Sequence, residues 1–315
     1  MKLRSIQLLR AVAVILVVYA HSIDLQMRFG HSFQEDFFYL KNFGAFGVDL
    51  FFVVSGFVIS LVAEKYSGAK QGFRFLARRF IRLNPVYYLV SALVFLLFFQ
   101  EAPTIKNIVL HGGVLRKSLL LLPLFDKIYW VHPLLAIGWT LSFEWLFYIQ
   151  FFIAILFTPR KKEWLIASLI VGMVALGIFH RSEDPRWIFL TSPIQLEFLL
   201  GIIIYRLYSR LDSSSLQAAQ IRLLAWTCLV AGTAICLYLV FTGFGEDLEM
   251  LDLVNGKSIG SRLLHWATAS ALLVAGATFM EKGDPQKSDH RLALGWSWLV
   301  LCGDASYSID RKSVV

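Results

Sequence analysis

The sequence predicts an all-α protein that crosses a membrane about nine times. Of its 315 residues, 57% are hydrophobic and 17% are charged, whereas a soluble domain carries about 25% charged residues. Several apolar runs reach the roughly 20 residues that a helix needs to cross a bilayer. A membrane β-barrel would show short segments of alternating polarity instead of these continuous runs.

Each expected transmembrane helix is an apolar run bounded by polar or charged residues. The runs lie at 6–24, 43–63, 84–100, 134–157, 164–180, 188–208, 223–243, 263–280 and 292–309. Pro193 and Gln195 make a polar break in the sixth run. The segment 118–125 is too short to span and contains Pro123, so we expect it to be interfacial or re-entrant.

The basic residues indicate the orientation of the chain. With a cytoplasmic N-terminus, the cytoplasmic loops and helix ends carry 17 Lys and Arg, and the outer loops carry 10. This bias predicts an N-terminus inside the cell. The net charge of +8 therefore follows from topology, and no basic tract with interleaved aromatic residues points to nucleic acid. The three cysteines lie in apolar runs and have no metal-binding spacing.

The C-terminal end departs from this pattern. The ninth run stops at the polar segment Asp310–Val315. We expect residues 310–315 to be a non-native tail, and residues 1–309 to form one membrane domain that is truncated at its C-terminus. The complete protein would then have about ten transmembrane helices.

Arg10 and His21 mark the first helix. They are eleven residues apart, which on an α-helix is roughly 16 Å of rise and about 20° around the axis. One face therefore has a cation near its start and an imidazole near the middle of the bilayer. A lone histidine in an apolar helix is usually structural, but an ionisable group inside a membrane favours function. Neutral imidazole accepts a proton from a hydroxyl near pH 7.

Three of the acidic residues within apolar runs, Asp49, Glu144 and Glu197, need a partner or a wet cavity. Asp49 falls in the stretch 47–57, where Gly47 and Gly56 would allow close helix packing. Glu144 lies near the middle of the fourth run, with Tyr148 four residues further along the same face. Glu197 is the third, and its role is open.

A basic block precedes the third run. Arg79 and Arg82 are three residues apart and share a helix face. They could simply follow the topology rule or bind anionic lipid headgroups. Alternatively they form a fork for phosphate groups, which guanidinium binds through paired hydrogen bonds.

Together these stretches resemble the acyltransferase 3 family of bacterial membrane enzymes, which O-acylate glycans and some small molecules. The family pattern of Arg, ten residues and His matches Arg10 and His21. The stretch 47–57 matches its G-V-D-x-F-F-V-x-S-G-F motif, and the pair Arg79 and Arg82 matches its R-x-x-R. Residues 139–148 match W-[ST]-L-x-x-E-x-x-F-Y. The last family motif matches only at Ser306–Ser308 and is lost from Asp310.

The resemblance implies a membrane O-acyltransferase in the bacterial inner membrane. It would move an acyl group, usually acetyl, from acyl-CoA to a hydroxyl of a cell-surface or exported carbohydrate, without a metal. The implied catalytic residues are His21, Arg10, Glu144 and Asp49. His21 would be the base for the acceptor hydroxyl or relay the acyl group, and Arg10 would orient the donor or stabilise the thioester oxyanion. Glu144 and Asp49 would orient either His21 or a sugar hydroxyl. The donor would be held by the side chains of Arg79, Arg82, Tyr148 and Trp139.

Two other classes of function fit the composition. A proton-coupled transporter could use His21 and the three acids as a relay, but the chain shows no paired inverted halves with matching broken helices. A scaffold that binds lipids or a partner protein would need none of these residues. The sequence does not identify the carbohydrate acceptor.

Overall fold

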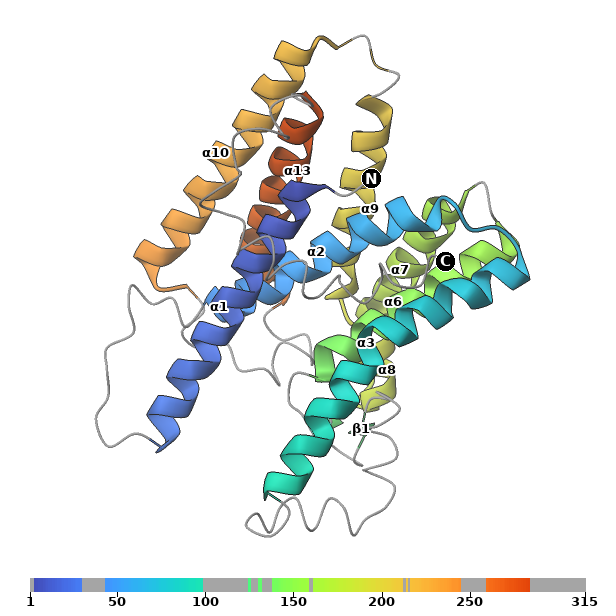
Figure 1. Ribbon diagram of the computed structural model, residues 1–315, viewed down its shortest axis with the longest axis vertical. Helices are drawn as coiled ribbons and strands as arrows, with labels where there is room; N and C mark the ends of the chain where they lie inside the picture. The colour runs from blue at the N-terminus through green and yellow to red at the C-terminus, as the bar shows by residue number, and fades with distance from the viewer. Residues whose placement is uncertain are drawn as a thin grey trace. The chain divides into compact units, whose positions relative to one another are not determined.

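The computed structural model describes residues 3–29, 43–98, 124–125, 130–131, 138–158, 161–211, 214, 216–244 and 259–283 (Figure 1). These residues fall into two compact units, each of which is described by itself. Unit 1 comprises residues 1–61, 196–249 and 258–315, and unit 2 comprises residues 62–195 and 250–257.

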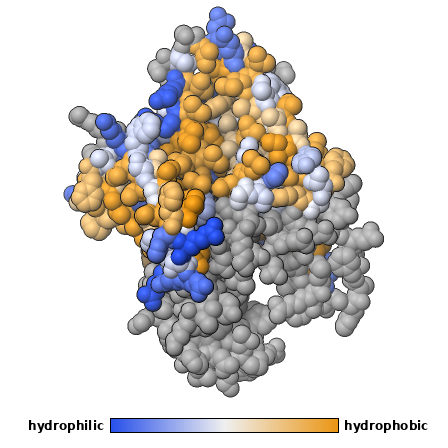
Figure 2. All heavy atoms as spheres, turned by 180° about the vertical axis from the view of Figure 1, so that it is seen from behind, coloured by the Kyte–Doolittle hydropathy of each residue, from blue (hydrophilic) through white to orange (hydrophobic). Residues whose placement is uncertain are grey.

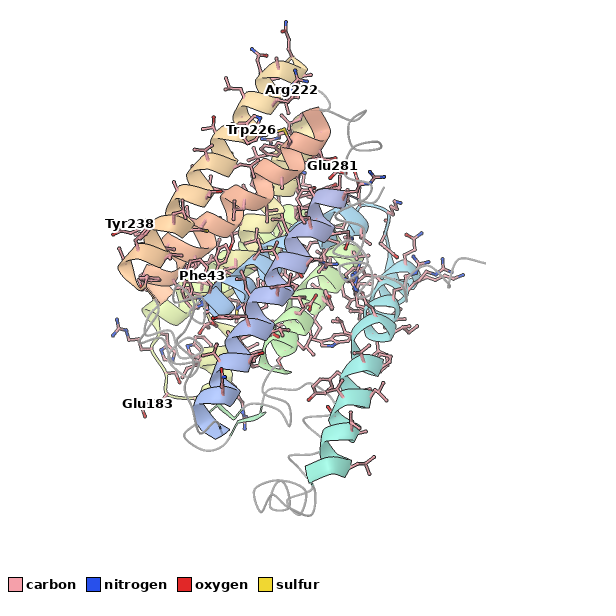
Figure 3. The ribbon with its side chains drawn as sticks, turned by 60° about the vertical axis from the view of Figure 1, so that its left-hand side comes forward. Phe43, Glu183, Arg222, Trp226, Tyr238 and Glu281 are labelled. Carbon is pink, nitrogen blue, oxygen red and sulfur yellow. The ribbon has the colours of Figure 1, made fainter. Side chains whose placement is uncertain are left out.

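Unit 1 is built from long apolar helices. They are α1 (Arg4–Phe29), α2 (Phe43–Ala63), α9 (Gln195–Arg210), α10 (Ala218–Thr242) and a final run. The final run comprises α12 (Ile259–Arg262), the π-helical turn η3 (Leu263–Ala267) and α13 (Thr268–Gly283). Helices α10 and α13 lie side by side, and α1 packs against α13 (Figures 1 and 3).

Glycines allow close approach of helix backbones in unit 1. A Cβ atom added at Gly47 of α2 would lie 2.8 Å from the Ala13 carbonyl oxygen of α1. A Cβ atom at Gly56 of α2 would overlap the Phe198 carbonyl of α9, and one at Gly201 of α9 would overlap the Val53 carbonyl of α2. The close packing that we predicted at Gly47 and Gly56 is therefore confirmed, because only glycine leaves room for these contacts.

The N-terminus of α1 is capped by the far end of α13. The Glu281 carboxylate accepts hydrogen bonds from the backbone N–H groups of Arg4 and Ser5, at 3.0 and 2.9 Å, and from the Ser5 hydroxyl at 2.6 Å. The first N–H groups of a helix have no partner within the helix itself. A carboxylate from another helix therefore supplies the cap.

Unit 2 contains a second group of helices and one short strand pair. The helices are α3 (Ala69–Phe98), α6 (Gly138–Phe157), α7 (Lys162–Phe179) and α8 (Pro185–Leu190). The two-residue strands β1 (Leu124–Phe125) and β2 (Trp130–Val131) pair antiparallel. Helix α6 packs against both α3 and α7, and α8 and α9 are separated by residues 191–194.

Lys162 fastens the start of α7 to the chain that follows α2. Its ammonium group is buried and donates hydrogen bonds to the carbonyl oxygens of Ala63, Glu64 and Tyr66. The last carbonyls of a helix lack intrahelical partners. We had assigned Lys162 to a cytoplasmic loop. Its burial and its structural role at the start of α7 were therefore not predicted.

The fold class is confirmed as all-α and multi-pass. Seven helical segments in the described residues are long and apolar enough to cross a membrane. Apolar side chains cover much of the described surface in Figure 2. Only 17% of the most apolar stretch of α10 is buried, and Trp226 and Tyr238 are among its exposed side chains (Figure 3). Such a surface suits hydrocarbon rather than water.

Several predicted boundaries change. We predicted that the third run begins at residue 84, whereas helix α3 begins at Ala69 and continues through Pro85. The helix therefore includes the basic block, in which Arg79 and Arg82 share a face. The polar break in the sixth run is confirmed, because α8 ends at Leu190 and α9 begins at Gln195. The ninth run, the tail 310–315, and all of 118–125 except Leu124–Phe125 lie outside the described residues.

Candidate active site

Arg79 of α3 lies where this helix packs against α6. Its guanidinium carbon is 5.3 Å from the ring centroid of Phe75 and 5.7 Å from that of Tyr148. Aromatic rings at these distances attract a guanidinium through its positive charge. The side chain is buried, and within the parts of the chain described its Nε atom has no hydrogen-bond partner. The rings thus hold a cation whose Nε donor is still available.

Glu144 and Tyr148 are joined on the next helix. The Tyr148 hydroxyl donates a hydrogen bond to the Glu144 carboxylate, one turn earlier on α6. Tyr148 is buried, and Glu144 is half-buried. The structure therefore joins Glu144, which we assigned to catalysis, to Tyr148 and so to Arg79, which we assigned to the donor.

The other two predicted donor residues lie in the same unit. Arg82 is half-buried one turn beyond Arg79 on α3. Trp139 is buried near the start of α6, with its ring 6.2 Å from that of Phe143 in a T-shaped arrangement. It lies nine residues before Tyr148, which is roughly 14 Å along the helix. Arg79, Arg82 and Tyr148 therefore form one cluster, and Trp139 lies further along α6.

Arg10 and His21 both belong to α1, a single continuous helix, so their predicted spacing holds. Their environments differ, however. Arg10 is buried, whereas the side chain of His21 is exposed. A Cβ atom on Gly44, the second residue of α2, would overlap Ala20 of α1. Beyond that level the described part of α2 no longer covers α1, which explains the exposure of the adjacent His21.

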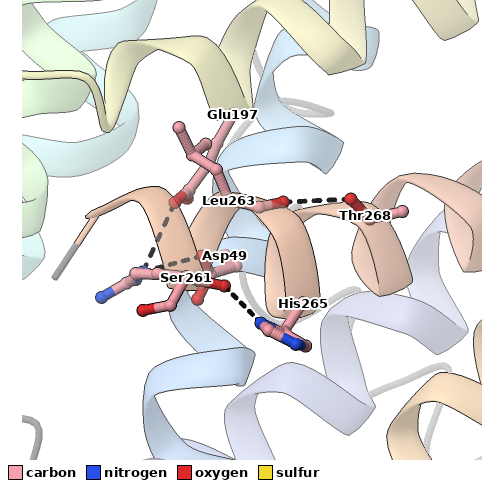
Figure 4. A network of polar contacts seen from close by, with 7 residues as sticks. Asp49, Glu197, Ser261, Leu263, His265 and Thr268 are labelled. Atoms are coloured by element: carbon pink, nitrogen blue, oxygen red, sulfur yellow. Dashed lines mark hydrogen bonds and ion pairs between the residues drawn. The ribbon is translucent and has the colours of Figure 1, made fainter.

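Asp49 has a partner that we did not predict. Its Oδ1 atom accepts a hydrogen bond from Arg262 Nε at 2.9 Å, and the same Nε lies 3.4 Å from Glu197 Oε1 (Figure 4). The exposed fractions of Asp49, Glu197 and Arg262 are 0%, 1% and 1%. We call these three residues the buried charge triad. Charges that leave water must be paired, and here α2, α9 and α12 each contribute one.

A widened helical turn follows Arg262 directly. The hydroxyl of Thr268, the first residue of α13, donates a hydrogen bond to the Leu263 carbonyl of η3 at 3.0 Å (Figure 4). Within η3, His265 Nδ1 lies 2.7 Å from the carbonyl of Ser261 in α12 (Figure 4). Turns of this π type are found frequently at functional sites.

Arg262 is the main residue that sequence reasoning missed. We counted it as an outer-loop charge because it stands immediately before an apolar run. Asp49 and Glu197 could have indicated it, because each acid lies in an apolar run and therefore needs a buried cation as a partner. Glu197 had been left without a role, and the structure places it in the triad.

The structure divides the predicted residues between the units. Arg10, His21 and Asp49 belong to unit 1, whereas Arg79, Arg82, Glu144, Tyr148 and Trp139 belong to unit 2. The two groups are therefore separate sets of residues, one in each unit. The fold and these residues define a multi-pass membrane protein with several ionisable side chains inside its helical units.

The chain belongs to the acyltransferase 3 family. A family model described as an acyltransferase domain matches residues 3–309. This membership classes the chain with enzymes that transfer acyl groups other than aminoacyl groups. The chain is also similar to the exopolysaccharide production protein ExoZ of Rhizobium meliloti (strain 1021), with 34% identity over 163 residues. That match covers 51% of this chain and 50% of ExoZ, about half of each protein. No solved structure matches the chain.

Proposed function

We propose that this protein is a membrane O-acyltransferase that moves an acyl group, most simply acetyl, from acyl-CoA to a hydroxyl of an exported carbohydrate. The observation that carries the proposal is the family match over residues 3–309. The similarity to a protein named for exopolysaccharide production supports a carbohydrate as the acceptor. The excess of Lys and Arg on one side supports a cytoplasmic N-terminus in the inner membrane of a bacterium.

Arg79 and Arg82 bind the phosphate groups of the donor in this proposal. The Nε atom of Arg79, which has no hydrogen-bond partner among the described residues, supports this assignment, because guanidinium binds phosphate oxygens through several N–H groups. Tyr148 holds the Arg79 guanidinium from one side, and Glu144 fixes the Tyr148 hydroxyl. Trp139 offers a further aromatic surface on the same helix.

His21 and Arg10 carry out the transfer step. His21 removes the proton from the acceptor hydroxyl, and the oxygen attacks the thioester carbonyl. A carbon–oxygen bond forms as the carbon–sulfur bond breaks, and the departing thiolate takes up the proton to give free CoA. The Arg10 guanidinium stabilises the negative charge that develops on the carbonyl oxygen. The exposure of His21 supports access by an acceptor.

The test measures acetyl transfer by the purified protein in detergent. Radiolabelled acetyl-CoA is supplied with oligosaccharides cut from the producing cells' own exopolysaccharide after base has removed its ester groups. We expect labelled oligosaccharide, and we expect His21→Ala to lower the rate by about 10²–10⁴-fold because it removes the base. His180→Ala is the matched control, since His180 is exposed after the end of α7 and accepts the Trp187 hydrogen bond through its backbone carbonyl. Full activity in His21→Ala would overturn the mechanism, and transport without CoA release would overturn the function.

A further inference from the structure

The buried charge triad has polar atoms that the protein leaves unused. Arg262 contacts both carboxylates through its Nε atom alone. Its two terminal nitrogens, together with Asp49 Oδ2 and Glu197 Oε2, have no hydrogen-bond partner among the residues that the structure describes. An arginine that served only to neutralise two acids would normally present paired terminal N–H groups to them.

Burial without partners costs free energy, so these atoms call for a further oxygen ligand. The terminal nitrogens of an arginine carry four N–H donors, and an ionised carboxylate only accepts. Buried polar atoms in native proteins almost always have a protein, water or ligand partner. The triad therefore places donors and acceptors that both lack hydrogen-bond partners close together in unit 1.

The unpartnered atoms of the triad select the chemistry of that ligand. The Arg262 terminal nitrogens only donate hydrogen bonds, whereas the Asp49 and Glu197 oxygens accept them. The Arg262 guanidinium disfavours a cation. A hydroxyl group both donates to a carboxylate and accepts from a guanidinium, so neighbouring hydroxyls of a neutral sugar match both kinds of atom.

Aromatic surface lies beside the triad. The Arg262 guanidinium carbon is 5.8 Å from the ring centroid of Trp266, one turn further along. Trp266 is fully buried, and its indole N–H also lacks a hydrogen-bond partner in the described segments. It is therefore one more donor near Arg262 for a sugar oxygen.

We propose that Asp49, Glu197 and Arg262 bind hydroxyl groups of the carbohydrate acceptor. This inference rests on the proposed function and assigns the acceptor to unit 1. The two carboxylates accept hydrogen bonds from the sugar, and the Arg262 terminal nitrogens donate to it. The triad is thus an acceptor-binding group, distinct from the Arg79 cluster that we assign to the anionic donor.

Two variants separate sugar binding from folding. Asp49→Asn with Arg262→Gln removes one charge of each sign, so the net charge of the triad is unchanged and no new unpaired cation is buried. Glu197→Gln alone keeps the 2.9 Å contact between Asp49 and Arg262. Thr278→Val is the control, because Thr278 is equally buried on α13 and bonds only to carbonyls of its own helix.

The experiment measures binding by calorimetry in detergent with two probes. One is the set of base-treated exopolysaccharide oligosaccharides, and the other is acetyl-CoA. For the double variant we expect oligosaccharide affinity to fall about tenfold or more, since hydrogen bonds to charged groups are lost. For Glu197→Gln we expect a smaller loss. Acetyl-CoA affinity of both variants should equal that of the wild type and Thr278→Val, which also shows that they are folded.

The outcomes are distinct from failure of the proposed function. Wild-type oligosaccharide affinity in the double variant would mean that water satisfies these atoms and would overturn the inference. If the double variant does not fold, wild-type affinity in Glu197→Gln would overturn it equally. Absence of oligosaccharide binding by the wild-type protein would also overturn it, even if acetyl-CoA binds. Failure of the proposed function itself would appear as oligosaccharide binding without acetyl transfer.

Discussion

The guanidinium of Arg79 lies over the ring of Tyr148, with 5.7 Å between the guanidinium carbon and the ring centroid. The hydroxyl of the same tyrosine donates to Glu144. One side chain therefore positions a cation through its ring and engages an acid through its oxygen. These two contacts can be removed one at a time.

Tyr148→Leu removes the ring and should raise the KM for acetyl-CoA about tenfold, because a desolvated cation–π contact is worth up to about 2 kcal/mol. Tyr148→Phe retains the ring and should change this KM by less than about threefold. Steady-state transfer at varied acetyl-CoA concentration measures both. Equal KM values for the two variants would show that the ring does not position Arg79 for the donor.

Lys162→Met should destabilise unit 2. The substitution keeps a long apolar chain but leaves the carbonyls of Ala63, Glu64 and Tyr66 without their ammonium donor. Loss of hydrogen bonds to a charged group costs about 1.5–3 kcal/mol. Thermal unfolding in detergent measures the effect, and Lys161→Met at the exposed neighbouring position should leave the midpoint unchanged. A midpoint as low for Lys161→Met would argue against this specific role.

Gly201→Ala should separate α9 from α2. The added methyl group would overlap the Val53 carbonyl of α2, and overpacking of this kind costs about 1–3 kcal/mol or more. Gly172→Ala on α7 is the matched control, because a Cβ atom there meets nothing within 4 Å. The unfolding midpoint should fall for Gly201→Ala only. Equal midpoints would mean that the two helices can move apart without cost.

Much of the architecture could be predicted from the sequence, because a long apolar segment in hydrocarbon must pair its own backbone polar groups and therefore forms a helix. The run 43–63 coincides with α2, and Pro193 with Gln195 marked the break before α9. The start of α3 could not be predicted in this way. Its first half is rich in charged residues and so fell outside the apolar run that we predicted from residue 84, whereas an aromatic ring of α6 lies against Arg79 in the structure.

Contacts within one helix could be predicted from the sequence, whereas contacts between helices could not. Spacing along one helix placed Tyr148 next to Glu144 correctly, because both lie on α6. Contacts between helices depend on tertiary packing, which the spacing of residues along the sequence does not indicate. Asp49 and Arg262 are 213 residues apart, so neither position indicated the other. The exposure of His21 on α1 likewise depends on which helices pack beside it, which spacing along α1 does not indicate.

The π turn η3 sets the angular register of the last described helix. Each α-helical residue turns the chain by about 100°, and a π turn holds one more residue than the α-helical turn that it replaces. Deletion of one residue within Leu263–Ala267 would therefore swing Arg262 by about 100° around the axis while α13 kept its packing on α10. The extra residue thus rotates the two ends of the run 259–283 relative to each other. As a result, α13 faces α10 while Arg262 of α12 faces Asp49.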